Sequence, residues 1–169
     1  MAWPLVELTA EELLALPAFS EASRVAVGAV VLRDERRLLL VLRREAPEGG
    51  GEGAGERESL EELPGGSVAA DETVGDAVRR VVAQATSLTV DEVGELWFGV
   101  TYEAREGATI HLTYAVEVVG ADEATVVVDP FTHTSYRWVP TDDLAATDLT
   151  PTVALALTEH LTPPSPPPA

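Results

Sequence analysis

The segment Leu63–Leu88 joins a glycine turn to an amphipathic helix, and this pairing constrains the fold more than any other part of the chain. The ELPGG run that ends at Gly66 favours a turn. Thr73 and Asp76 then form a capping pair for a helix that begins after Thr73. Apolar side chains recur in this helix at three- and four-residue spacing, at Val74, Ala77, Val78, Val81, Val82 and Ala85. Such a broad apolar stripe must be buried, and next to strands it predicts an α/β fold.

Apolar and alternating runs on both sides of this helix predict the strands of the sheet. They lie at Arg24–Leu32, Arg37–Leu42, Glu95–Ala104, Thr109–Val118, Val126–Asp129 and Tyr136–Val139. Tight turns are expected at Asp34-Glu35 and across Arg105-Glu106-Gly107. A short helix over residues 5–16 and a closing helix over Pro151–Leu161, with Pro151 in its first turn, complete the expected elements.

Composition divides the chain into three regions. Residues 1–23 form an N-terminal extension with its short helix, and residues 24–161 form the main domain. The tail at 162–169 is rich in proline and is expected to be disordered. Inside the main domain, the loop Glu45–Glu62 holds seven glutamates and one arginine, so we expect it to be solvated and mobile.

The charge and residue content exclude several classes of function. The formal charge of −18 opposes contact with nucleic acid and with anionic membranes. No apolar run reaches the roughly 18 residues that a membrane-spanning helix needs. The absence of cysteine excludes disulfides, thiolate catalysis and zinc sites built from cysteine, and it favours a cytoplasmic protein. Small-molecule ligands remain, together with a homodimer as a possible assembly.

Leu63–Leu88 resembles the Nudix box, the sequence pattern of the Nudix hydrolase superfamily. Five of its positions fit that pattern: Gly66, Glu72, Arg80, Val82 and Leu88. The three glutamates that hold Mg²⁺ in active relatives fall on Val81, Gln84 and Ala85, and a glycine falls on Ser87. The similarity extends over roughly Arg24–Leu161 and includes the RWVPTDDL run at Arg137–Leu144. It implies a Nudix-type α/β/α sandwich with a mixed β-sheet, in which Glu72 and Arg80 form a structural ion pair.

The residues at the three glutamate positions argue against a metal site. Val81 and Ala85 carry no ligand atom, and Gln84 carries one neutral oxygen, whereas Mg²⁺ requires six oxygen ligands in near-octahedral geometry. We therefore expect no metal and no other cofactor. Mg²⁺ enters only in an alternative in which Glu72, Asp71, Asp76 and the acids of the Glu45–Glu62 loop act as displaced ligands.

The strand Thr109–Val118 suggests where a ligand binds instead. One of its faces is apolar, and the other carries Thr109, His111, Thr113, Ala115 and Glu117, which we expect to face solvent or a cleft. If the mixed face of the neighbouring strand coincides with it, one surface forms from Trp97, Thr101, Glu103, His111, Thr113 and Glu117. The candidate catalytic residues are His111, Glu117, Glu103 and Glu72. The candidate substrate-binding residues are Trp97, Thr101, Thr113, His133 and Arg43.

Three functions fit these features. The first is a repurposed enzyme that acts on a small molecule without a metal, as in biosynthesis, through an acid–base pair such as His111 and Glu117. The second is a non-catalytic module that binds a small molecule or nucleotide and regulates another process. The third is a Mg²⁺-dependent pyrophosphohydrolase with displaced acidic ligands.

Overall fold

A computed structural model of the protein describes residues 5–44, 60–104, 107–120 and 123–161. The predicted turn residues Arg105 and Glu106, most of the predicted loop Glu45–Glu62 and the tail at 162–169 lie outside these ranges. Among the described helices, none is long and apolar enough to cross a membrane.

Three α-helices and seven strands make up the described part of the chain. The helices are α1 (Ala10–Leu14), α2 (Val74–Thr86) and α3 (Pro151–Leu161), with short 3-10 turns η1 (Leu5–Glu7), η2 (Pro17–Phe19) and η3 (Leu144–Ala146). The strands are β1 (Arg24–Arg33), β2 (Leu38–Arg43), β3 (Glu61–Glu62), β4 (Gly65–Ser67), β5 (Val90–Ala104), β6 (Gly107–Val118) and β7 (Ser135–Pro140).

The sheet is organised around β1, which changes neighbours along its length. Its first part pairs in parallel with β6 and antiparallel with β4, whereas its end pairs antiparallel with β2. The strand order is β3-β2-β1-β6-β5, and β7 adds to the free edge of β2. One parallel pair among antiparallel ones makes the sheet mixed, as expected.

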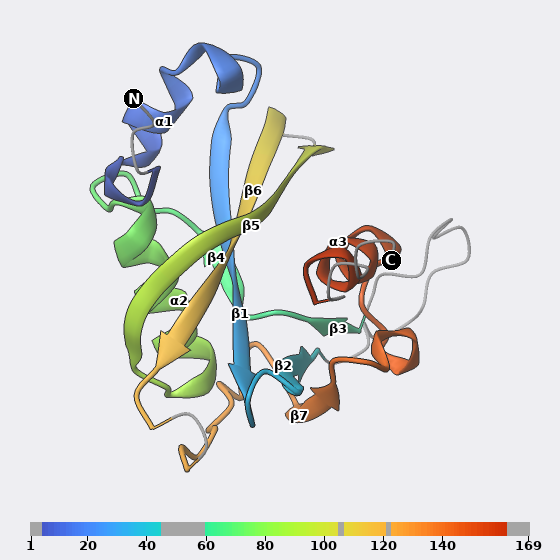
Figure 1. Cartoon of the computed structure of the whole chain (residues 1–169). Coiled ribbons are helices and arrows are strands. Elements are labelled where there is room, and N and C mark those ends of the chain that lie inside the picture. Colours follow the sequence, from blue (N-terminus) through green and yellow to red (C-terminus); the bar gives the residue numbers. More distant parts are fainter. Residues whose placement is uncertain (1–4, 45–59, 105–106, 121–122, 162–169) are drawn as a thin grey trace, which may run out of the picture.

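Helices cover both faces of this sheet and produce two cores (Figure 1). The stripe of α2 packs with apolar residues of β1 and β6, and all six of its predicted apolar residues are buried. Leu157 of α3 packs with Trp97 of β5 and with residues of β2 on the opposite side. The architecture is therefore an α/β/α sandwich, which confirms the predicted fold class.

The N-terminal residues belong to the first of these cores. The predicted short helix is confirmed as η1 and α1, with the Thr9 hydroxyl accepting a hydrogen bond from the Glu12 amide at 3.2 Å. Leu8 and Leu13 are buried in the cluster that contains α2. The Leu8 carbonyl also accepts a hydrogen bond from the Val74 amide at 2.8 Å. The extension therefore ties the start of α2 to the rest of the domain.

Most predicted elements are confirmed within one or two residues, including β1, β2, β6, β7 and α3. The turn after β1 forms where predicted, and Asp34, Glu35 and Arg36 all adopt positive φ there. The predicted strand Val126–Asp129 is wrong. Its amides instead bond to the last turn of α2, with Val127 donating to the Thr86 carbonyl at 2.9 Å. The end of a helix offers unpaired carbonyls, so an extended segment beside it satisfies them without a strand partner.

The end of the predicted acidic loop also differs from expectation, because Glu61 and Glu62 form strand β3. Glu61 is 4% exposed. Its carboxylate accepts two hydrogen bonds from Arg137 of β7, at 2.7 and 2.6 Å, and one from the Asp148 amide at 2.7 Å. A buried carboxylate is stable when it is paired and hydrogen-bonded, and this one joins β3, β7 and the segment before α3.

We predict that Glu61→Gln lowers the free energy of unfolding by about 2–3 kcal/mol, because it removes hydrogen bonds to a charged partner in a buried place. Urea unfolding measures the change. The matched control is Glu35→Gln, which breaks the Glu35–Arg37 pair whose side chains are 82% and 71% exposed. That variant should lose less than about 1 kcal/mol. Equal losses in the two variants would contradict the role given to Glu61.

The contribution of Glu61 should also depend on pH. Hydrogen bonds from Arg137 hold the pKa of Glu61 below its ordinary value of 4.5, although burial acts in the opposite direction. Because the folded pKa is the lower one, the stabilisation is complete above pH 4.5 and is lost as the pH falls through the folded pKa. The difference in unfolding free energy between wild type and Glu61→Gln should therefore shrink between neutral pH and roughly pH 3. A difference that stays constant in urea titrations over this range would contradict the assignment.

Candidate functional site

A cavity of about 630 Å³ lies between the sheet and the start of α3. Its walls come from β1, β3, β4, β5, β6 and the segment Leu149–Val153, and they include Arg44, Glu62, Tyr102, His111, Thr113 and Thr150. A volume of this size suits a small organic molecule. Apolar walls contributed by Ala26, Leu63, Leu149 and Val153 alternate with these polar groups.

His111 is the titratable group that faces this cavity from the centre of the sheet. Its ring lies over Gly28 of β1: a Cβ atom added at Gly28 would stand 2.8 Å from the His111 Cε1 atom. Glycine at this position therefore makes room for the imidazole. Burial lowers the pKa of His111, and the nearby Glu62 carboxylate acts in the opposite direction. The neutral form consequently dominates near neutral pH, which is the form that accepts a proton.

The two ring nitrogens of His111 have different surroundings. Nδ1 lies 3.4 Å from the Thr113 hydroxyl. Within the described residues, Nε2 has no hydrogen-bonding partner from the protein. One nitrogen is thus oriented by a neighbour, and the other is available to a molecule in the cavity.

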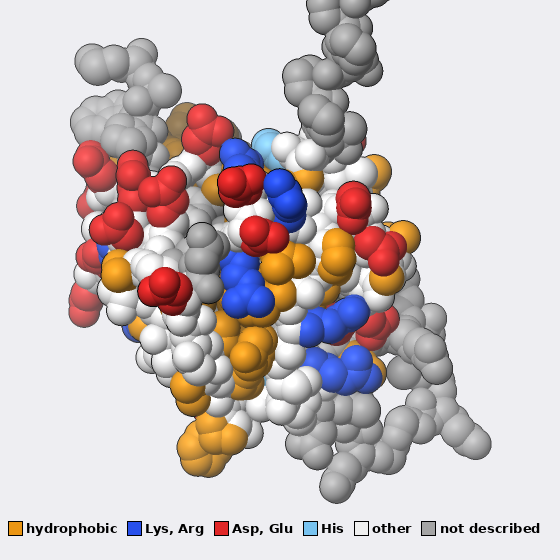
Figure 2. Space-filling view, turned by 60° about the horizontal axis from the view of Figure 1, so that its bottom comes forward, with side chains coloured by type: hydrophobic (Ala, Val, Ile, Leu, Met, Phe, Trp, Pro, Cys, Tyr) orange, Lys and Arg blue, Asp and Glu red, His pale blue; other side chains and the backbone are white. Residues whose placement is uncertain are grey.

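Glu62 connects this cavity to a second histidine. Its carboxylate oxygens contact His133 Nε2 at 2.7 Å and Arg44 Nε at 3.5 Å. The other ring nitrogen of His133 lies 2.8 Å from the Thr132 hydroxyl. On the face of the molecule in Figure 2, arginine side chains likewise lie next to acidic ones. Both ring nitrogens of the buried His133 thus have a partner, and the residue holds Glu62 in place. His133 itself does not line the cavity.

The predicted polar row on β6 does not form one open surface. Thr109 and Thr113 are buried, at 6% and 1% exposure, but Thr113 lines the cavity with His111. The row was expected to face solvent or a cleft, and part of it faces a cleft. Glu117 lines a different cavity from His111. The two residues are six positions apart on one strand, which separates them by about 20 Å. An acid–base pair of His111 and Glu117 is therefore not brought together.

The register of β5 also separates the candidates. Val100 and Phe98 stand opposite His111 and Thr113, whereas Thr101 stands opposite Ile110. Residues that stand opposite each other share a face, so Thr101 and Glu103, opposite Ile110 and Ala108, lie on the side away from His111. The condition that the two mixed faces coincide is not met. Tyr102 takes the place beside His111 and lines the cavity.

Two predicted ligand contacts lie elsewhere. Trp97 is 8% exposed, and its ring stacks on His160 of α3 with the centroids 4.9 Å apart. Arg43 is exposed and does not line the cavity, whereas its neighbour Arg44 does. Successive strand residues point to opposite faces, and this alternation selects Arg44. The roles given to Trp97, Arg43 and the candidate catalytic residues remain predictions.

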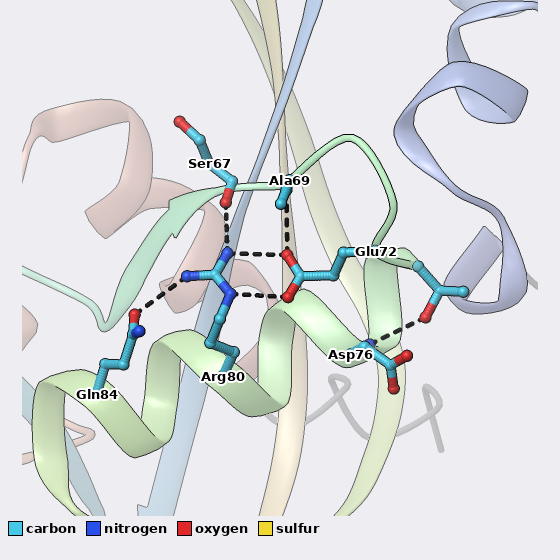
Figure 3. Close-up of polar contacts among 7 residues, drawn as sticks. Ser67, Ala69, Glu72, Asp76, Arg80 and Gln84 are labelled. Carbon is cyan, nitrogen blue, oxygen red and sulfur yellow. Dashed lines mark hydrogen bonds and ion pairs between the residues drawn. The ribbon is translucent and has the colours of Figure 1, made fainter.

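On helix α2, Arg80 is the centre of a hydrogen-bond network (Figure 3). It donates to both carboxylate oxygens of Glu72 at 2.7 and 2.9 Å and to the Ser67 carbonyl at 2.8 Å. Glu72 also accepts a hydrogen bond from the Ala69 amide at 3.1 Å. The Arg80 hydrogen bonds lower the pKa of Glu72. The predicted ion pair is present, and it fastens the loop before α2 to the middle of the helix.

The three positions that would carry metal ligands hold packed or engaged side chains. Val81 and Ala85 are 3% and 7% exposed. A Cβ atom added at Gly66 would stand 3.1 Å from a Val81 methyl carbon, so Val81 packs against the glycine turn. The Gln84 side-chain oxygen accepts a hydrogen bond from Arg80 at 3.1 Å. These residues do not fit a Mg²⁺ ion, because none offers a carboxylate and the one oxygen is already bonded. Elsewhere in the described residues, no group of three acidic, histidine or cysteine side chains is placed to hold a metal.

Ser87 occupies the position of the glycine in the box pattern. Its backbone is left-handed, with φ of 63°, and it ends α2. A non-glycine residue is strained there, but the Ser87 hydroxyl donates to the Val127 carbonyl at 3.3 Å. The serine therefore preserves the shape of the helix end.

The sequence reasoning missed Glu62, Arg44 and Tyr102 as members of the site. The sequence places Glu62 in a solvated loop because it follows a run of glycine and glutamate. The one signal for it was its position directly before the Leu63–Gly66 turn, which places it next to the sheet. Nothing in the local pattern distinguishes Tyr102 from the other alternating residues of β5, since its face is set by the register in which β5 pairs with β6.

Comparison with known proteins gives a consistent result. A family model described as the NUDIX domain matches residues 22–159. No curated protein is similar enough in sequence to count as a match.

Several solved structures share the fold. The MutT protein from Methanosarcina mazei Go1 is 25% identical with a TM-score of 0.63, and the alignment covers 80% of this chain and 91% of that chain. A MutT NUDIX hydrolase from Burkholderia pseudomallei is 28% identical with a TM-score of 0.61, covering 82% and 98%. The NUDIX domain of Shewanella oneidensis NrtR, complexed with ADP ribose, is 20% identical with a TM-score of 0.60, covering 92% and 99%.

Proposed function

The chain belongs to the Nudix family, and from this premise we propose that it is an enzyme that acts on a small molecule by acid–base chemistry at His111, without Mg²⁺ on helix α2. The observation that carries this proposal is the His111 imidazole in the cavity, with Nε2 available and the Glu62 carboxylate in the same lining. Burial lowers the pKa of His111 and so favours the neutral form. An imidazole in this state accepts a proton from a bound substrate and later returns it.

Glu62 supplies the charge that such a step requires. Once His111 accepts a proton, the cation that forms is stabilised by the nearby carboxylate, which already acts to raise the pKa of His111. His133 and Arg44 hold this carboxylate in position. We therefore propose Glu62 as the partner in place of Glu117 and Glu103, and we assign Glu72 to the structural ion pair, since Arg80 donates to both of its oxygens.

The loss of the Mg²⁺-dependent reaction is the second part of the proposal. Diphosphate hydrolysis in this family relies on a divalent ion that neutralises the substrate during attack by water. The side chains at positions 81, 84 and 85 favour apolar packing and a hydrogen bond to Arg80 over metal binding.

A binding module is the second candidate function. It is favoured by the pairing of Glu62 with both Arg44 and His133, since a carboxylate with two partners is suited to fixed recognition. One relative of the same fold, the NrtR domain, has been solved with ADP ribose. A ligand that raises the melting temperature of wild type and of His111→Gln alike, with no turnover, would select this candidate.

We predict that MgCl₂ or MnCl₂ leaves the melting temperature of the wild-type protein unchanged. A variant with Val81→Glu, Gln84→Glu and Ala85→Glu should be destabilised by about 2–4 kcal/mol without metal, because two carboxylates become buried without partners. Mn²⁺ should restore part of that loss in thermal unfolding.

The control for the added charge is Ala83→Glu, which changes an exposed position of the same helix. Its stability should match that of the wild type both without metal and with Mn²⁺. A wild-type protein stabilised by Mg²⁺ would contradict the proposal. That result would instead favour a hydrolase with displaced acidic ligands.

We predict that the wild-type protein, in buffer with EDTA, depletes at least one compound from a cellular metabolite extract followed by mass spectrometry. His111→Gln should lower that rate by about 10²–10⁴-fold, since it removes the acid–base group. Gly28→Ala keeps the imidazole but displaces its ring, so it should lower the rate by about 10²-fold.

Glu117→Gln serves as the matched control, because Glu117 lies outside this cavity. In the same assay it also tests the acid–base pair of His111 and Glu117 that the sequence predicts. Turnover that requires Mg²⁺, or that survives His111→Gln, would contradict the proposed mechanism.

A further inference from the structure

The charged groups around the cavity form ion pairs. Among the described lining residues there is one arginine, Arg44, and there are two glutamates, Glu61 and Glu62. Arg44 lies 3.5 Å from Glu62. Glu61 is held by Arg137, whose side chain lies outside the cavity lining. Each of the two glutamates therefore has an arginine beside it, and the one arginine of the described lining already has a carboxylate partner.

A diphosphate is a poor match for such a lining. Proteins bind phosphate groups through Arg, Lys, helix N-termini or a divalent ion, which offset the negative charge. Here the described walls offer Arg44 alone, shared with Glu62, and the whole chain carries a formal charge of −18. An anionic ligand is therefore repelled at long range by the net charge, and inside the cavity it meets an arginine that is already paired with Glu62.

The remaining walls favour a flat molecule. Tyr102 is 46% exposed and lines the cavity beside His111, where its ring can cover a planar ligand. Leu149 and Val153 provide an apolar wall from the start of α3. Thr150 adds a hydroxyl, and His111 adds a ring nitrogen, so a ligand with a few polar groups can be oriented there.

We propose that the ligand of this cavity is a planar ring compound that carries no anionic group, uncharged or singly positive, and that Glu62 enforces this selection. The inference concerns the same cavity as the proposed function and rests on it for the place of binding. It differs in content, because it assigns the substrate class and does not depend on whether His111 transfers a proton.

The test uses three probes that share one ring and differ in charge: benzamidine, benzamide and benzoate. Binding is followed by NMR of the histidine side chains in EDTA, with the His111 signal assigned from its absence in His111→Gln. Probes of this size bind with a Kd on the order of 1 mM. We expect benzamidine and benzamide to shift the His111 signal, with benzoate at least about 10-fold weaker, which corresponds to the effect of a single unfavourable charge contact.

Glu62→Gln should reduce the preference against benzoate to less than about 3-fold, because the repelling carboxylate is gone. Glu123→Gln removes the same charge from an exposed position outside the cavity lining and should leave the preference unchanged. If Glu62→Gln fails to fold, Arg44→Gln gives the opposite test, since loss of the cation should strengthen the preference against benzoate.

Three results would overturn the inference: equal binding of benzoate and benzamide, the same preference in Glu62→Gln as in wild type, or no probe that shifts the His111 signal. Failure of the proposed function is distinguishable, because it appears as metal-free turnover that is absent or independent of His111. If turnover is absent or independent of His111, the three probes can still bind with the expected order of affinities.

Discussion

The buried carboxylate of Glu61 is the interaction on which the site depends. Two hydrogen bonds from Arg137 and one from the Asp148 amide fix it between β3, β7 and the segment that leads into α3. Glu62, the next residue, points its carboxylate toward His133 and Arg44 at the cavity. Leu149, on the other wall, directly follows Asp148. One buried group thus sets the distance between the two sides of the cavity, and it is stable there because its charge is fully paired.

Helix α2 shows how a structural network persists apart from metal binding. Arg80 satisfies Glu72, the Ser67 carbonyl and Gln84 at once, and this holds the glycine turn against the helix. None of these contacts involves a metal ligand. Arg80 uses its planar fork of donors, which a lysine lacks, so the geometry of the loop is fixed by hydrogen bonds alone.

The sequence predicts the fold well because the features that determine it are local. The capping of α2 by Thr73 and the apolar stripe are confirmed, as is the hairpin of β5 and β6. The site is predicted less well, since it depends on contacts between distant residues. Glu62 meets His133 across a separation of 71 positions, and no local pattern encodes that meeting. Tyr102 shares the face of His111 because of the pairing register between β5 and β6, in which Val100 stands opposite His111 and Tyr102 opposite Thr109.

Apolar side chains in place of carboxylates at positions 81 and 85 make α2 more stable when no metal ion is bound. A valine buried at position 81 contributes about 1.5–3 kcal/mol relative to an exposed one. A carboxylate buried at the same place without a cation would lower the stability by several kcal/mol, because its desolvation is not compensated. A helix of the metal-binding type therefore depends on its ion for part of its stability, whereas Val81 and Ala85 make this helix stable in its absence. Val81 also fills the space beside Gly66. On the opposite side of the turn, Glu62 and His111 both line one cavity.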